Sequence, residues 1–208
     1  MSVFNLDNFI SSFVILWAVI DPFGTVPVFI TVTKGYDEIE KRKIARFSSI
    51  VAFCILLFFM IVGEYILKRV GVPLAAFQIS GGVILFLFAS NMIFGSSKPE
   101  EEIQLVQDEK ETAIFPLAIP SIAGPGAILA VVLLADTTRN SFASMLFTIF
   151  ILIIVLLINF ILMLLSSKIH KRIGNSGAIV ISKVMGLILA SMAANNILLG
   201  IKEFFKIV

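Results

Sequence analysis

The chain has 208 residues, of which 59% are hydrophobic and only 14% are charged, with a net charge of +2. A soluble domain carries about 25% charged and about 45–50% apolar residues. The composition therefore excludes a water-soluble globular enzyme, a disordered chain and a disulfide scaffold. The single cysteine, Cys54, lies in an apolar run and is expected to be a small buried side chain.

Six apolar runs account for nearly the whole chain, and each is long enough to cross the hydrocarbon core as a helix of about 20 residues. A β-barrel would instead show alternating strands of about ten residues. We therefore expect an all-α, polytopic membrane protein that forms a single transmembrane domain over residues 1–208. The predicted spans are Phe9–Ile30, Phe47–Leu67, Leu74–Phe94, Ala113–Ala135, Phe142–Leu165 and Ala178–Ile201.

The basic residues predict the orientation, because Lys and Arg favour cytoplasmic loops. The first, third and fifth loops, together with Lys183 just beyond the fifth, hold 11 of them, including Lys41, Arg42 and Lys43, against 5 on the other side. Both termini are therefore expected outside. No Lys or Arg precedes Lys34, so the first run is interpreted as a retained span rather than a signal peptide. His170 belongs to the basic fifth loop, where a topology-setting charge cluster is expected rather than a catalytic or metal role.

Two pairs of segments resemble each other. DPFGTVP at residues 21–27 and IPSIAGP at 119–125 each carry two prolines five positions apart, at an offset of 98. Residues 79–95 and 184–200 align at an offset of 105, which pairs their glycines and asparagines. The same order and similar offsets predict two three-helix repeats, at about 1–95 and 113–208, joined by a linker at about 96–112. Three spans are an odd number, so the second repeat must be inverted, as in many secondary transporters.

Both proline motifs lie near the middle of their spans, so helices 1 and 4 are expected to be broken near the membrane midplane. Proline removes a backbone donor, and irregular backbone at that depth is tolerated only where protein buries it or where it lines a cavity. The motifs form either a substrate site, which we favour, or a pair of structural kinks. The candidate substrate-binding residues there are Asp21, Pro22, Gly24, Thr25, Pro27, Pro120, Ser121, Ala123, Gly124, Pro125 and Gly126.

The helix ends at these breaks favour a small zwitterion as the ligand. The N-terminus of each second half-helix offers N–H groups to a carboxylate. The C-terminus of each first half-helix offers carbonyl groups to an ammonium. The carboxylate of Asp21 is a further partner for the ammonium. An uncharged solute or a small ion remains an alternative.

Asp21 is the only acidic residue near mid-membrane, where a charge needs a partner or a function. One interpretation is an N-cap, with Pro22 at the first helical position. The other adds binding of the substrate ammonium or of a coupling proton; the second motif has Ile119 at the matching position. Glu64 is a second proton-coupling candidate, although pairing with Lys68 is the simpler interpretation.

Four asparagines lie in the spans, one of them Asn195 beside Asn196. Asn91 and Asn196 are matched by the repeat and either bond across helices or line the site, so both are candidate substrate-binding residues. Asn159 in the fifth span has no matched partner, and helix packing is the better interpretation for it.

The motifs DPFGTVPVF and IPSIAGPGAI and the six-helix format resemble the MarC family, which includes the SnatA small neutral amino acid transporters. The resemblance covers essentially the whole chain. It implies a prokaryotic inner-membrane transporter with inverted three-helix repeats that moves glycine or alanine with an ion gradient. By residue matching, it implies a site at residues 21–27 and 119–126.

The expected function is secondary active transport of small neutral amino acids, with H+ the expected coupling ion; the alternative is an exporter or channel for another small solute. An enzyme is not expected, because the only His lies in a loop and one mid-membrane Asp makes no dyad. The chain has no GxxxxGK[ST] loop, so uphill transport needs an ion gradient or a partner. The expected partners are the solute, the ion and the bilayer, with no cofactor, metal or nucleic acid.

Overall fold

The computed structural model describes residues 6–95, 109–135 and 142–206, and the regular structure there is helical, as predicted. Most of the expected linker, with Lys98, lies outside the described residues. The elements are α1 (Leu6–Ile20), α2 (Pro22–Val32), α3 (Glu38–Val70), α4 (Leu74–Phe94), α5 (Glu109–Thr112), η2 (Ala113–Ile122), α6 (Pro125–Leu134), α7 (Phe142–Leu164) and α8 (Ser166–Phe204).

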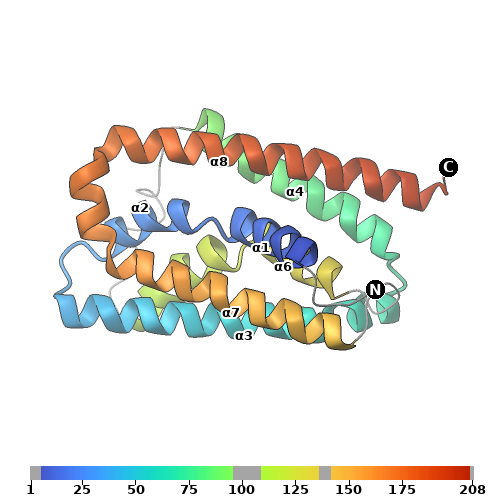
Figure 1. Cartoon of the computed structure of the whole chain (residues 1–208), viewed down its shortest axis with the longest axis horizontal. Helices are drawn as coiled ribbons and strands as arrows, with labels where there is room; N and C mark the ends of the chain where they lie inside the picture. Colours follow the sequence, from blue (N-terminus) through green and yellow to red (C-terminus); the bar gives the residue numbers. More distant parts are fainter. Residues whose placement is uncertain (1–5, 96–108, 136–141, 207–208) are drawn as a thin grey trace.

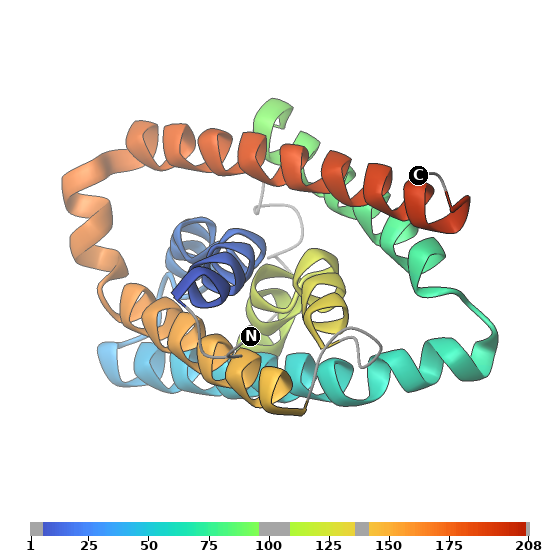
Figure 2. The same ribbon diagram turned by 45° about the vertical axis from the view of Figure 1, so that its right-hand side comes forward.

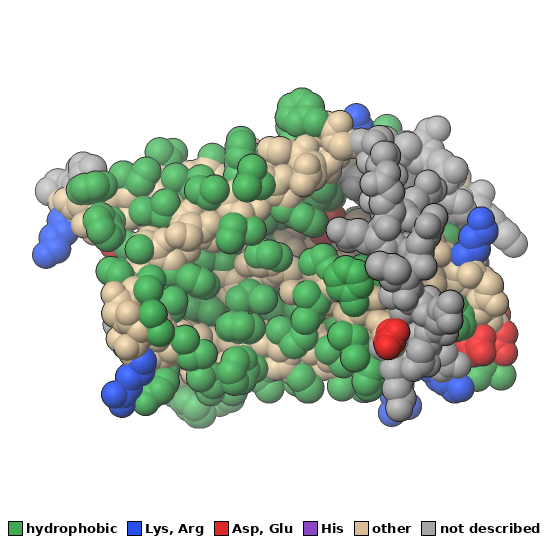
Figure 3. Space-filling view, turned by 180° about the vertical axis from the view of Figure 1, so that it is seen from behind, with side chains coloured by type: hydrophobic (Ala, Val, Ile, Leu, Met, Phe, Trp, Pro, Cys, Tyr) green, Lys and Arg blue, Asp and Glu red, His purple; other side chains and the backbone are tan. Residues whose placement is uncertain are grey.

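Within the described residues, five helical stretches are long and apolar enough to cross a membrane: α1 with α2, α3, α4, α7 and the Lys183–Phe204 part of α8. The bent pair of η2 and α6 makes a sixth if it counts as one span. Figure 3 shows hydrophobic side chains across the middle of one face, with charged side chains towards its two ends. This distribution is typical of a protein that crosses a bilayer.

The two proline-containing segments form the interior of the bundle. In Figures 1 and 2, α1 with α2 and η2 with α6 lie between a layer of α3 and α7 and a layer of α4 and α8. Half of an apolar 18-residue stretch of the first span is buried, against 22% of such a stretch in α3. Leu16, Ile20 and Ile122 have no exposed surface. Protein therefore covers the first break and the end of η2, as irregular backbone at membrane depth requires, whereas Phe115 and Ile119 within η2 are exposed.

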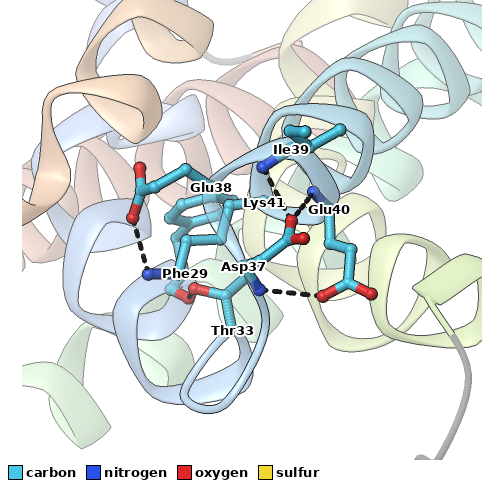
Figure 4. Close-up of polar contacts among 7 residues, drawn as sticks. All are labelled: Phe29, Thr33, Asp37, Glu38, Ile39, Glu40 and Lys41. Carbon is cyan, nitrogen blue, oxygen red and sulfur yellow. Dashed lines mark hydrogen bonds and ion pairs between the residues drawn. The ribbon is translucent and has the colours of Figure 1, made fainter.

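The start of α3 is defined by a capping box (Figure 4). The Asp37 carboxylate accepts the N–H groups of Ile39 and Glu40 at 2.8 and 2.7 Å, and Glu40 Oε2 accepts the Asp37 N–H at 2.8 Å. These bonds satisfy donors that a helix start leaves open. The helix therefore begins nine residues before the predicted span, and Lys41 and Arg42, which we expected in a loop, lie on its first turns.

Replacing Asp37 with alanine is expected to lower the stability of the protein by about 1 kcal/mol, because the cap to two backbone donors is lost. Thermal unfolding in detergent measures the change. Asp37→Asn is the matched control, since Asn caps about as well as Asp. Equal melting temperatures for wild type and Asp37→Ala would contradict the capping assignment.

The fifth loop also proves to be helical. The chain turns at Leu165, and α8 begins at Ser166, 12 residues before the predicted sixth span. Lys168 and the backbone of His170 therefore lie on α8, while the His170 side chain lies outside the described residues. The segment between α7 and Lys183 has no proline, and α8 continues through Gly174 and Gly177 although glycine disfavours a helix interior. In Figures 1 and 2, α8 curves before it runs beside α4.

Small residues bring α4 and α8 into close contact. A Cβ at Gly82 would lie 3.1 Å from the Ala193 carbonyl oxygen, and one at Gly186 would lie 3.1 Å from the Ala89 carbonyl oxygen. Small residues at such contacts are typical of helix packing in membranes. Residues with higher numbers on α4 contact residues with lower numbers on α8, so the two helices are antiparallel. Cys54, which we expected to be buried, is exposed on α3, on an apolar surface that lipid would cover.

Candidate functional site

The first break is a single residue between two helices. Asp21 has φ 47° and ψ 69°, a left-handed conformation that ends α1, and α2 starts at Pro22. The Asp21 Oδ1 accepts the Gly24 N–H at 3.0 Å, which confirms the predicted N-cap. A Cβ at Gly24 would collide with the Asp21 carboxylate, so glycine is needed for this approach. Because Pro22 has no N–H, the Ala18 carbonyl loses its usual helical donor.

The second break is longer and more irregular. Within η2, Phe115 and Ile119 have extended backbone conformations, and both precede a proline, which disfavours the helical conformation of the preceding residue. The axis then bends by 56° between η2 and α6. Pro125 begins α6 after Gly124, which has no side chain to cap the new helix.

The two breaks correspond to each other through their helix starts. Asp21–Pro22 and Gly124–Pro125 each supply the cap and the first residue of a half-helix, at an offset of 103. The sequence motifs had paired Pro22 with Pro120 at an offset of 98. Pro120 instead lies inside η2, so the counterpart of Asp21 is Gly124 rather than Ile119. The carboxylate of Asp21 therefore has no acidic counterpart at the second break.

A hydrogen bond joins the two motifs. Ser121 Oγ donates to Thr25 Oγ1 at 3.4 Å, across 96 positions of sequence. Thr25 Oγ1 in turn donates to the Asp21 carbonyl at 3.2 Å. Asp21 is 5% exposed and Thr25 is 1% exposed. The structure therefore joins the two predicted motifs through one hydrogen bond, where Asp21 and Thr25 are buried and Ser121 is half-buried.

The other predicted site residues differ in burial. Gly126 packs against α4, where a Cβ would require the terminal methyl group of Leu85 to move. Asn91 is exposed on α4 and Asn196 is half-buried on α8, and their binding roles stay predictions. Of the remaining motif residues, Pro22, Ala123 and Gly124 are buried, Gly24, Pro27, Pro120 and Ser121 are half-buried, and Pro125 is exposed.

Glu64 lies on α3 and makes an ion pair with Lys68, which confirms the pairing predicted from the sequence. The Glu64 side chain is only 12% exposed, whereas Lys68 is 60% exposed. Its role in proton coupling stays a prediction. Among the described residues, the structure contains no cluster of three His, Cys, Asp or Glu side chains suited to a metal ion.

Sequence reasoning missed two features of the interior. The rings of Phe13, Trp17 and Phe23 pack in succession across it, with centroids 5.7 and 5.8 Å apart. Asn159 on α7 has no exposed surface. Neither polar atom of its carboxamide has a hydrogen-bond partner among the described residues. The signal for Asn159 was a lone amide in a strongly apolar span, but its burial required the packed structure.

Comparison with known proteins agrees with this architecture. The family described as "MarC family integral membrane protein" matches residues 6–205 of this chain. The UPF0056 membrane protein MJ1677 of Methanocaldococcus jannaschii is 35% identical over 201 residues, covering 95% of this chain and 98% of the relative. The corresponding protein PH0760 of Pyrococcus horikoshii is 37% identical (95% and 98% covered), and YvbG of Bacillus subtilis is 32% identical (94% of each). No solved structure matches the chain. The chain therefore belongs to the MarC family of multi-pass integral membrane proteins.

Proposed function

We propose that the chain is a secondary active transporter of small neutral amino acids such as glycine or alanine. The zwitterion is held between the α1–α2 break and the η2–α6 break, and transport uses alternating access coupled to an ion gradient, with H+ as the ion. The observation that carries the proposal is the hydrogen bond between the half-buried Ser121 and the buried Thr25, which links the two proline motifs.

The two half-helix starts offer different chemistry to a zwitterion. Pro125 has no N–H, and the N–H groups of Gly126 and Ala127 have no acceptor within the first turn of α6. Gly124 provides no side-chain cap, so these donors are available to a carboxylate. At the other break, the Asp21 carboxylate is the counterpart for an ammonium. A molecule that carries both charges at a short separation therefore fits the pair of breaks.

Alternating access at this site uses two inverted repeats, residues 1–95 and 113–208. The helix contacts occur in matching pairs, as an inverted repeat requires: α1 packs on α7 as η2 packs on α3, and α2 packs on α8 as α6 packs on α4. The antiparallel packing of α4 on α8 fits the same relation. Rocking of one repeat against the other around a fixed central site is the usual form of alternating access.

The protein is oriented with both termini outside a prokaryotic plasma (inner) membrane. In Figure 1 the N and C ends lie at one end of the bundle and the start of α3 lies at the other. The first turns of α3 carry Lys41, Arg42 and Lys43. Basic residues favour the cytoplasmic side, and the bacterial and archaeal relatives support a prokaryotic membrane.

Cysteine labelling tests the orientation. In a variant without Cys54, a reagent restricted to the outside is expected to label Glu203→Cys and not Arg42→Cys, because α8 ends outside and α3 begins inside. Labelling of both after permeabilisation controls for reactivity. The reverse pattern in intact cells would contradict the proposed orientation.

A thermal-shift screen of the purified protein tests the substrate class. Glycine or alanine is expected to raise the melting temperature, because a ligand that binds only the folded state stabilises it by about 2.7 kcal/mol at 100 times its Kd. Acidic and basic amino acids serve as matched controls and should have no effect. No shift with any small neutral amino acid, or a shift with an unrelated solute alone, would contradict the proposal.

A further inference from the structure

Asn159 is unlike the other buried polar residues of the bundle. Thr148, on the same buried face of α7, donates its hydroxyl to the Ser144 carbonyl at 3.0 Å. Asn159 has no exposed surface, and among the described residues it is the buried side chain whose nitrogen and oxygen both lack a partner. Burying a carboxamide without hydrogen bonds costs free energy that an apolar side chain avoids. The neighbouring turns of this face carry Leu152 and Val155, so an apolar residue would fit the pattern.

The position of Asn159 along α7 matches the depth of the first break. α1 and α7 run in the same direction (Figures 1 and 2), and the rings of Phe9 and Phe147 pack with centroids 6.2 Å apart. Twelve residues beyond these rings, the two helices reach Asp21 and Asn159 respectively. Equal rise per residue therefore puts both at the same depth, to within about one helical turn. α7 packs on both α1 and α2, so it borders the break from either side.

We infer that Asn159 is a further substrate-binding residue, whose carboxamide oxygen accepts a hydrogen bond from the ammonium of the transported zwitterion beside Asp21. A primary ammonium has three donors, and a single carboxylate leaves some of them unsatisfied. The bound solute gives the buried carboxamide the partner that the fold lacks. This inference rests on the proposed function, since it assigns a second binding partner to the ammonium group of the same solute.

The test measures binding of radiolabelled alanine to purified wild type, Asn159→Leu and Thr148→Val. Leucine has the same number and branching of side-chain heavy atoms and removes the polar ones, so the Asn159 variant is expected to melt at the same or a higher temperature without ligand. Its Kd for alanine should rise about ten-fold or more, because a hydrogen bond to a charged group is lost. Thr148→Val should keep the wild-type Kd, since Thr148 bonds only within its own helix.

The outcomes separate this inference from the proposed function. A folded Asn159→Leu with wild-type affinity would overturn the inference and leave the function standing. Wild-type protein that binds no small neutral amino acid would overturn both. Asn159→Val is a smaller apolar variant, prepared in parallel. Failure of both apolar variants to give folded protein would show that the carboxamide has a structural partner, and would also overturn the inference.

Discussion

Gly124→Leu is expected to reduce amino acid uptake to background while the protein still inserts into the membrane. A Cβ at Gly124 would lie 2.7 Å from the Pro120 carbonyl oxygen, a backbone atom that cannot move aside without changing the second break. The rest of the leucine side chain would compete with the solute for the start of α6. Uptake of radiolabelled alanine into proteoliposomes measures the effect.

The control for this variant is Ser191→Leu, which adds the same side chain on an exposed part of α8. It should transport at the wild-type rate. Gel filtration of both variants checks that they fold. Wild-type uptake by folded Gly124→Leu would contradict a solute site at the second break.

Asp21→Asn is expected to keep the fold and to lose substrate binding. Asn caps a helix about as well as Asp and also tolerates the left-handed conformation observed at residue 21. The variant lacks only the negative charge, so affinity for a zwitterion should fall about ten-fold or more, as for other charged hydrogen bonds. Alanine exchange and pH-driven accumulation are measured separately in proteoliposomes.

Each result for Asp21→Asn assigns a different role. Loss of exchange supports binding of the ammonium. Normal exchange without pH-driven accumulation assigns the coupling proton to Asp21 instead. Unchanged affinity and accumulation would make Asp21 a helix cap alone. Asp37→Asn is the matched control, because it makes the same change at the other Asp N-cap, at the exposed start of α3.

The sequence was sufficient to predict the first break, because its chemistry is local. An Asp followed by proline inside an apolar span can cap and start a half-helix without help from the rest of the fold, and Asp21 does so. The helix starts at Glu38 and Ser166 were missed, since hydropathy detects only the part of a helix inside the membrane. Asp37 and Glu40 extend α3 beyond that part through a capping box.

The features that depend on packing could not be predicted from the residues. Matching prolines suggested that Pro22 pairs with Pro120, but a proline that lies within an irregular helix looks the same in sequence as one that starts a helix. The contact between Thr25 and Ser121 joins positions 96 residues apart. Whether Asn159 finds a partner depends on side chains from other helices, which no local pattern contains.

Counterflow of radiolabelled alanine in proteoliposomes tests most directly whether the two breaks form one substrate site. We predict saturable counterflow by the wild type and a raised half-saturation concentration in the double variant Thr25→Val, Ser121→Ala, which removes the hydroxyls that join the breaks. Absence of counterflow by the wild type, or an unchanged half-saturation concentration in the folded double variant, would contradict this account.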